Sequence, residues 1–200
     1  QPATLERLHA DGIQVVVSVD CGIRGAEAAR RARAIGLDLI ITDHHEPDNE
    51  LPDALAVVNP KRHDCTYPDK QLAGVGVALK IAQALIGDGG HAEQMNEFLE
   101  IAAIGTVADV MKLTGENRSI VSLGLRQLSR SRNPGLRALM EISDCTSEMT
   151  SLPIGFRIAP RINAAGRMDV ARHVVELLES PDVASARKYA GILDSRNRER

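Results

Sequence analysis

The sequence predicts an α/β fold in which a parallel sheet is followed by a helical segment. Residues 14–19 and 37–42 form short, β-branched, continuously apolar runs, which are typical of strands buried on both faces of a parallel sheet. The alanine-rich segment 25–35 between them carries its arginines on one side, as a crossover helix does. These three segments together predict a βαβ unit.

The rest of the chain is expected to add one strand and then only helices. A third short strand at 55–58 follows a proline-bounded loop and precedes a polar loop rich in turn residues. From residue 72 onward, apolar residues recur with helical spacing between glycines and prolines. Helices are therefore predicted at 75–85, 92–107, 119–129, 135–142, 153–158, 170–179 and from 183 onward.

Composition excludes several classes of protein. With 200 residues, 44% apolar and 26% charged, the chain can bury a core, so disorder, collagen and a disulfide scaffold are excluded. No apolar run approaches the roughly 18 residues of a membrane span, and the first residues do not resemble a signal peptide. A soluble, cytoplasmic protein is expected, in which Cys21, Cys65 and Cys145 are free thiols.

Charge is unevenly distributed along the chain. The net charge of -3 and the aromatic content of 2% argue against a nucleic-acid binder as a whole. Between Arg118 and Arg167, however, eight arginines stand against three acidic residues. This segment is either a strip that faces phosphates or a solvated helical surface.

Chemically useful side chains follow the predicted strands. Asp20 ends the first strand, while Asp43, His44 and His45 follow the second, and the carboxyl ends of parallel strands share one edge. Asp109 ends a further apolar segment. Carboxylates and imidazoles without cysteine favour Mn²⁺, with Mg²⁺ or Zn²⁺ as alternatives. Turn capping by the aspartates and a merely polar loop at the histidines are the competing interpretations.

Several longer strings resemble a known group of enzymes. ITDHHEP, with VSVDCG upstream and GTVADVMKLTGENR downstream, resembles the DHH phosphoesterase superfamily. The string PRINAAGRM narrows the resemblance to the RecJ family of single-strand-specific exonucleases. The resemblance covers essentially the whole chain, with the motifs in the family's order.

The resemblance implies a role for each residue at the strand ends. Asp20, His44 and Asp109 would be metal ligands, with Asp20 able to bridge two Mn²⁺ or Mg²⁺ ions in the complete protein. A two-metal site can activate water and stabilise the leaving oxygen in phosphoester hydrolysis, so Asp20 also counts as catalytic. His45 would lie against the scissile phosphate as a hydrogen-bond donor or general acid, and Asp43 would orient a histidine.

Contacts with DNA phosphates are also implied by the family motifs. The candidates are Arg161, Arg167, Asn163 and Arg118, because guanidinium presents a planar fork of donors to phosphate oxygens. Asn163 could instead cap a turn, and the loop of Asn117 and Arg118 could be structural.

Other polar or small residues have weaker patterns. Gly74 and Gly76 resemble a phosphate-binding loop, although close helix packing explains them equally well. Cys21 is expected only to pack, and the remaining histidines are expected at the surface: His63, His91 and His173.

The resemblance also implies a domain organisation. Residues 1–115 would form the DHH phosphoesterase α/β part, 116–182 the helical part of the catalytic core, and 183–200 the start of a long linker helix. The family's first strand motif, H-x-D-x-D-G-like, would precede Gln1, and its DHHA1 domain would follow Arg200. The 200-residue chain alone is therefore expected to be inactive, and robust metal-dependent hydrolysis by it would refute this expectation.

The function implied is that of a core fragment of a metal-dependent 5′-to-3′ exonuclease acting on single-stranded DNA in recombination and repair. A single-strand-binding protein and a helicase would be further partners, and no membrane is involved. One alternative is another DHH phosphoesterase that acts on pyrophosphate, cyclic dinucleotides or short oligonucleotides. The other is a non-catalytic relative that binds DNA or a protein partner.

Overall fold

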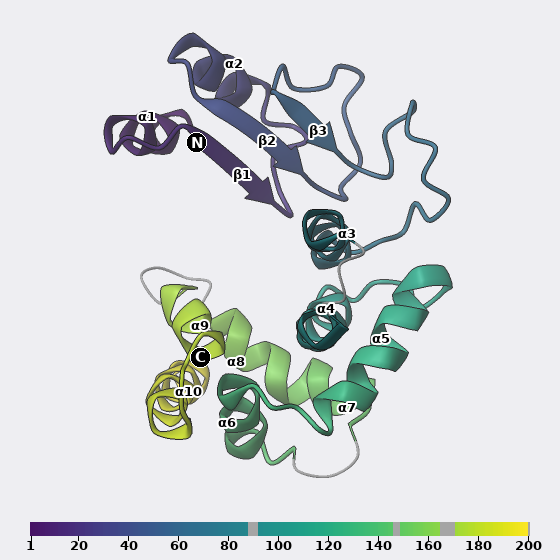
Figure 1. The fold of residues 1–200 in the computed structure, drawn as a ribbon, viewed down its shortest axis with the longest axis vertical. Helices are drawn as coiled ribbons and strands as arrows, with labels where there is room; N and C mark the ends of the chain where they lie inside the picture. Colours follow the sequence, from purple (N-terminus) through teal and green to yellow (C-terminus); the bar gives the residue numbers. More distant parts are fainter. Residues whose placement is uncertain (88–91, 146–148, 165–170, 200) are drawn as a thin grey trace. The chain divides into compact units, whose positions relative to one another are not determined.

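The computed structural model describes residues 1–87, 92–145, 149–164 and 171–199, and the chain divides into two compact units (Figure 1). The first unit contains residues 1–87 and 114–117, and the second contains 88–113 and 118–200. The helix that ends at Ala108 belongs to the second unit, and the predicted domain parts 1–115, 116–182 and 183–200 stay a prediction.

Hydrogen bonds explain why the short segment 114–117 belongs to the first unit. The Glu116 backbone N–H donates to Asp69 Oδ2 at 2.7 Å, and Asn117 Nδ2 donates to the Gln71 carbonyl at 2.6 Å. Asn117 is fully buried, so its side chain has a structural role.

A three-stranded parallel sheet forms the centre of the first unit. Its strands are β1 (Val15–Val19), β2 (Asp38–Thr42) and β3 (Ala56–Val58), in the order β1-β2-β3. Val19 pairs with Thr42, and Thr42 pairs with Val58, so all three strands end at the same edge. The three predicted strands and their parallel arrangement are confirmed.

Helices α1 (Pro2–Ala10) and α2 (Ala26–Ala34) share one core with the sheet. Small buried residues of α2, Ala29 and Ala32, let the helix lie close to Leu39 and Ile41 of β2. Helix α2 is the predicted crossover, whereas α1 was not predicted. The remaining helix of the first unit, α3 (Gly74–Ile86), contacts β1 and β2.

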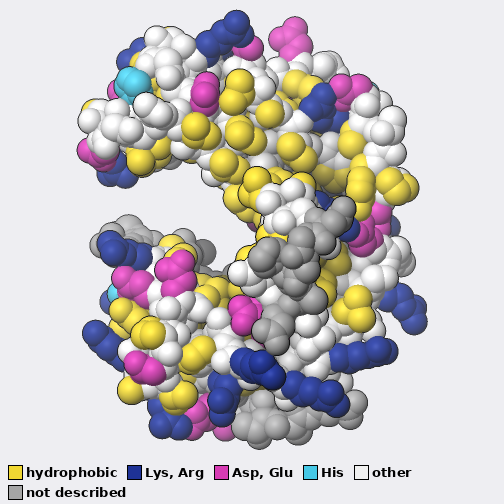
Figure 2. All heavy atoms as spheres, in the orientation of Figure 1, with side chains coloured by type: hydrophobic (Ala, Val, Ile, Leu, Met, Phe, Trp, Pro, Cys, Tyr) yellow, Lys and Arg dark blue, Asp and Glu magenta, His cyan; other side chains and the backbone are white. Residues whose placement is uncertain are grey.

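The prediction that β1 is buried on both faces is wrong. Val15, Val17 and Val19 are 51%, 49% and 51% exposed, while Val16 packs into the core with α1 and α2. Strand β1 lies at the edge of the described sheet, and its alternate side chains point to the face opposite α1 and α2. Figure 2 shows the resulting gathering of hydrophobic side chains over β1.

The described residues of the second unit form helices joined by loops, without a strand. Its large, fully buried side chains include Leu128, Leu136, Ile154, Leu177 and Leu193, which belong to one core cluster. Helix α5 begins in the first unit and continues in the second. The described elements are α4 (Ala92–Ala108), α5 (Gly115–Leu128), α6 (Pro134–Ile142), α7 (Ser151–Pro153), the π-helix η1 (Ile154–Ile158), α8 (Ala159–Ala164), α9 (Ala171–Leu178) and α10 (Val183–Arg198).

Capping residues set where two of these helices begin. Asn133 precedes α6, and its Oδ1 accepts the Leu136 N–H at 3.0 Å; Asp182 accepts the Ser185 N–H at 2.8 Å at the start of α10. Among the described helices, none is long and apolar enough to cross a membrane.

Candidate metal centre

The turn after β1 presents Asp20 in a strained backbone conformation. Asp20 has a φ of +62°, in the left-handed region that non-glycine residues rarely adopt, and Gly22 two residues later has a φ of +114°. The Ser18 hydroxyl donates to the Cys21 carbonyl at 2.9 Å and closes the turn. Strain of this kind persists where the surrounding structure fixes it, often at functional sites.

The first residue of α3, Gly74, lies against the side chain of Asp20. A Cβ atom at Gly74 would overlap Asp20 Oδ1, far inside van der Waals contact. The sequence left open whether Gly74 belongs to a phosphate-binding loop or to a close packing contact. Close packing against the Asp20 carboxylate explains this glycine. The contact also fixes where the Asp20 carboxylate can go.

Strand β2 delivers two histidines to the same place. His44 is buried, and its Nε2 lies 3.1 Å from Asp20 Oδ1. Ligand atoms of Asp20, His44 and His45 all lie within 4.8 Å of one another. A carboxylate and two imidazoles at this spacing fit a divalent ion such as Mn²⁺, so the predicted convergence at the sheet edge is confirmed.

The Asp43 carboxylate holds the residues around this group in place through hydrogen bonds. Its buried carboxylate accepts the backbone N–H groups of Ile23 at 2.9 Å and His44 at 2.7 Å. It also accepts the N–H of His45 at 3.2 Å, and His45 Nδ1 lies 2.7 Å from the same oxygen. Burial raises the pKa of the Asp43 carboxyl, but the hydrogen bonds from Ile23, His45 and His44 outweigh burial and lower this pKa below its ordinary value of 3.8.

The contact with Asp43 determines the tautomer of His45. Because the Asp43 carboxylate is ionised and can only accept, His45 Nδ1 must carry the proton that it shares. The side chain of His45 is 56% exposed, and Nε2 is the nitrogen left for a metal or a substrate. Asp43 thus contacts His45, and its role in orienting this histidine for catalysis stays a prediction.

Asn59 is a site residue that sequence analysis missed. It is 2% exposed, and its Nδ2 donates to the His45 carbonyl at 2.9 Å, while its Oδ1 accepts the Lys61 N–H at 2.8 Å. The Asn-Pro pair directly after the third predicted strand was the available signal, because the carboxyl end of that strand lies at the same edge.

Asp109 lies in the second unit, directly after α4. Its N–H donates to the Gly105 carbonyl at 2.9 Å, so this aspartate ends a helix, and its side chain is exposed. Its membership of the metal site stays a prediction.

The predicted phosphate contacts differ in their surroundings. Arg161 is held in the second unit: its Nε and a terminal nitrogen both lie 2.9 Å from Asp194 Oδ1, and Nη1 donates to the Arg157 carbonyl at 2.7 Å. Arg118 and Asn163 are exposed on α5 and α8, and Asn163 is the last residue but one of α8 as described. Arg167 lies outside the described residues. Phosphate binding by these residues stays a prediction.

The cysteines and the remaining histidines differ in how exposed they are. The three cysteines are free, as predicted, but Cys21 is exposed and so does not pack into the core. His63 is exposed, as expected. The expectation for His173 is wrong, because it is half-buried with its ring centroid 5.8 Å from that of Tyr189. His91 lies outside the described residues.

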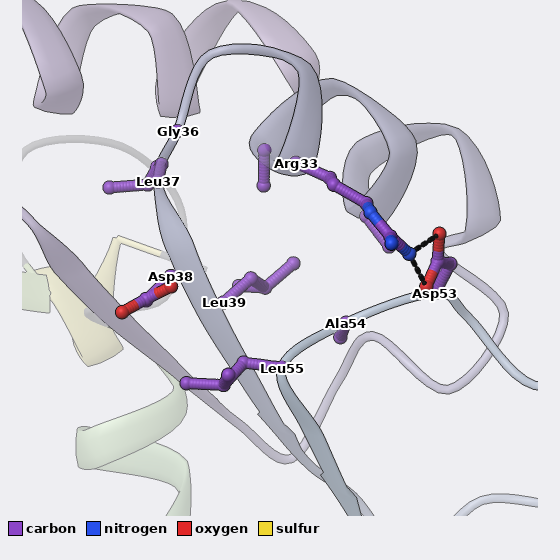
Figure 3. A pocket seen from close by; sticks show the side chains of 10 residues that line it. Arg33, Gly36, Leu37, Asp38, Leu39, Asp53, Ala54 and Leu55 are labelled. Atoms are coloured by element: carbon purple, nitrogen blue, oxygen red, sulfur yellow. Dashed lines mark hydrogen bonds and ion pairs between the residues drawn. The ribbon is translucent and has the colours of Figure 1, made fainter.

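The opposite edge of the sheet carries a hollow of a different character. Its lining includes Leu39, Ala54, Arg33 and Asp53, and Figure 3 shows Arg33 and Asp53 pointing toward one another. These two side chains form an ion pair, and Asp38 adds a further carboxylate to the lining. The histidine cluster lies at the carboxyl ends of the strands, the usual ligand-binding edge of a parallel sheet.

These features define the class of the protein: an α/β domain with a candidate divalent-metal site at the carboxyl edge of its parallel sheet. Residues 2–106 match the family described as "DHH family, N-terminal domain". The chain belongs to the DHH family.

The chain is also similar to proteins named RecJ. It is 47% identical over 190 residues to the "Single-stranded-DNA-specific exonuclease RecJ" of Bacillus subtilis, in a match that covers 94% of this chain and 24% of that protein. The solved structure of RecJ in complex with Mn²⁺ from Thermus thermophilus has a TM-score of 0.84 and 34% identity, over 100% of this chain and 30% of that chain. A structure of exonuclease RecJ bound to manganese has a TM-score of 0.83 and 34% identity, over 98% of this chain and 49% of that chain. The chain thus spans about a quarter of the length of the Bacillus relative.

Proposed function

We propose that this chain is the core of a metal-dependent 5′-to-3′ exonuclease that hydrolyses phosphodiester bonds of single-stranded DNA in recombination and repair. The observation that carries the proposal is the group of Asp20, His44 and His45, whose ligand atoms lie within 4.8 Å of one another. The similarity to single-stranded-DNA-specific exonucleases supports the choice of substrate.

Asp20 and His44 would hold the metal, and Asp109 would add a further ligand. The donor set fits Mn²⁺ or Mg²⁺, and two ions would be held in the complete protein. A bound divalent ion would supply activation of water and stabilisation of the leaving oxygen. The close packing of Gly74 keeps the Asp20 carboxylate beside His44.

His45 would act on the substrate through Nε2. Its Nδ1–H is donated to Asp43, so the ring cannot rotate freely and Nε2 stays directed away from that carboxylate. When Nε2 also carries a proton, His45 can hydrogen-bond a phosphate oxygen or give that proton to the leaving oxygen, while Asp43 holds Nδ1–H. The carbonyl of His45 is fixed by Asn59, which holds the backbone in place.

The second unit would supply contacts with the DNA backbone. Lys and Arg side chains gather over this unit in Figure 2, and the proposed phosphate contacts are Arg118, Arg161, Asn163 and Arg167. Contacts with phosphate position a strand without reading its bases. A single-strand-binding protein and a helicase are the proposed protein partners, and residues 183–200, which contain α10, are proposed as the start of a linker helix.

The test compares nucleotide release from three substrates by the gene product that contains this sequence at its natural length. With Mn²⁺, we expect early release of the 5′ nucleotide from 5′-labelled single-stranded DNA, and none from duplex DNA or pyrophosphate. Turnover of pyrophosphate alone would identify a different DHH phosphoesterase. Release from no substrate would leave a binding protein and contradict the proposal.

A further inference from the structure

A second hollow of the first unit lies beside the metal-ligating group. This β3 hollow has a volume of ≈ 390 Å³ and is lined by the end of β3, the loop up to Tyr67 and one side of α3. Apolar side chains make up much of its lining, including Val58, Leu72 and Val77, and Tyr67 adds an aromatic residue. The candidate function described above leaves this hollow without a role.

The sheet connects the β3 hollow directly to the candidate metal centre. The Asp43 N–H donates to the Val58 carbonyl at 3.0 Å, and Asn59 donates to the His45 carbonyl at 2.9 Å. Val58 and Asn59 both line the hollow. Since neighbouring strands lie about 4.8 Å apart, the hollow begins one strand away from the histidines.

Helix α3 provides a second, independent connection. Its first residue, Gly74, lies against the Asp20 carboxylate, while Val77 and Lys80 line the hollow. At about 1.5 Å of rise per residue, these lining positions lie about 4.5 and 9 Å along the helix from Gly74. A nucleotide whose phosphate lay at the metal-ligating group could therefore place its own base or a neighbouring base in the hollow.

The polar groups around the β3 hollow are engaged with one another. Tyr67 and Lys80 both contact the Glu116 carboxylate. Arg62 donates to Asp64 through Nε at 2.9 Å. The hollow thus offers apolar surface and neutralised charge, which suits the flat face of a base and does not select among base edges.

We propose that the β3 hollow receives a nucleobase of the substrate strand next to the scissile phosphate, without preference for its identity. This inference rests on the proposed function and names the part of the strand that the first unit holds. Base binding of this kind would favour an unpaired strand, because a base in a duplex is stacked and paired and cannot enter a pocket unless it is flipped out.

The test uses the full-length gene product and single strands in which one of the first few nucleotides from the 5′ end is abasic. Stacking or apolar burial of one base is worth enough that we expect kcat/KM to fall about tenfold when the abasic nucleotide occupies one particular position. Abasic nucleotides at the other positions should have little effect.

Filling the hollow should remove this dependence. Val58→Trp places a large side chain at a lining position that is 42% exposed, and Thr66→Trp does the same from the exposed loop. Both variants should cleave the natural strand about tenfold more slowly and the abasic strand as the native protein does. Val15→Trp is the matched control on β1, 51% exposed and outside the hollow, and should keep the tenfold dependence.

Two results would overturn the inference in distinguishable ways. Hydrolysis of all strands with no abasic penalty, or with the same penalty in Val58→Trp and Thr66→Trp as in the native protein, would contradict the base-binding role alone. Absence of hydrolysis of any strand in the native protein would contradict the proposed function and, with it, this inference. Mn²⁺ titration of both variants verifies that they retain the fold of the site.

Discussion

At the candidate metal centre, Asp43 holds other residues in position, whereas Asp20 and His44 are the proposed metal ligands. Its carboxylate accepts hydrogen bonds from Ile23, His44 and His45, so it fixes the turn after β1 and the residues after β2 at once. Asp20 and His44 provide the close carboxylate–imidazole pair that would hold an ion. Substitution of Asp43 should therefore affect chemistry more than metal affinity.

We predict that Asp43→Asn lowers kcat on single-stranded DNA by about 10²-fold, because His45 loses the carboxylate that accepts its Nδ1–H and holds its ring in position. Mn²⁺ affinity should change by less than about tenfold, the lower end of the effect of residues that support metal ligands. Steady-state kinetics and calorimetric titration of the full-length protein measure the two quantities. A loss of Mn²⁺ affinity as large as the loss of kcat would show that Asp43 is itself a ligand.

A second prediction concerns Gly74, which lies against the Asp20 carboxylate. A Cβ at position 74 would overlap Asp20 Oδ1, so Gly74→Ala should displace the carboxylate and weaken Mn²⁺ binding about tenfold or more. Gly191→Ala is the matched control, because Gly191 also lies in a helix and nothing lies within 4 Å of its added Cβ. Equal Mn²⁺ affinities in the two variants would contradict the role given to Gly74.

Sequence reasoning found the residues of this site whose chemistry is visible along the chain. Asp20, His44 and His45 each follow a strand, and parallel pairing brings strand ends together. Gly74 could not be assigned in this way, and Asn59 was missed although it too follows a strand. Their roles depend on contacts with His45 and Asp20, which only the folded chain creates.

At the scale of elements, a buried ion-pair network joins α8 to α10. Asp194 is 7% exposed at its side chain and pairs with Arg161 at 2.9 Å and with Arg198 at 2.8 Å. The Arg161 side chain is 17% exposed. Asp194 lies on α10, the helix that is proposed to lead into the linker. Through its ion pair, α10 positions Arg161, which is a proposed phosphate contact.

Asp194→Ala should destabilise the chain by about 3 kcal/mol, because it leaves Arg161 buried without its carboxylate. Arg172→Ala is the control: its side chain is 84% exposed, and its pair with Glu176 should contribute no more than about 0.5 kcal/mol. Urea unfolding of both variants measures the difference. Similar losses of stability in the two would contradict a structural role for the Asp194 network.

A buried glutamate in α4 gives a prediction about pH. Glu100 is 4% exposed and accepts the Ser131 hydroxyl at 2.5 Å, and burial raises its pKa above the ordinary 4.5. The protonated form is therefore favoured in the fold, so this group stabilises below its unfolded pKa and that stability is lost as the pH rises through the folded pKa.

Glu100→Gln should consequently be more stable than the native chain at pH about 8, and the difference should disappear near pH about 4. Urea unfolding at the two pH values tests this, with Glu27→Gln, at an exposed glutamate of α2, as the control. A native chain that is the more stable of the two at the higher pH would show that ionised Glu100 is stabilised by its surroundings.

Helices and strands with strong local sequence patterns were predicted more accurately than the others. Helices such as α5 and α6 have glycine, proline or asparagine near their starts, and their predicted ranges agree with the structure to within a few residues. The apolar run of β1 predicted a strand but not its exposed face, because a β-branched run is the same whether one or both faces are covered. Helix α1, which buries only Leu5, was not predicted.

At the scale of the whole molecule, each compact unit has its own core, and the Asp20, His44 and His45 group lies entirely within the first. The second unit holds Asp109 and the proposed DNA-binding residues that the structure describes. The two units are therefore expected to have different roles. Substitutions in the first unit should affect metal binding and chemistry, and those of exposed arginines in the second should affect binding of the strand.

The most direct test is Mn²⁺ titration of the full-length gene product by isothermal calorimetry, comparing the native protein with Asp20→Ala and Asp38→Ala. Asp38 is an exposed carboxylate at the opposite end of the same sheet, so its loss controls for charge. We predict saturable binding that Asp20→Ala weakens more than about tenfold and Asp38→Ala leaves unchanged. Equal Mn²⁺ affinity in the native protein and Asp20→Ala would contradict a metal centre at the carboxyl edge of the sheet.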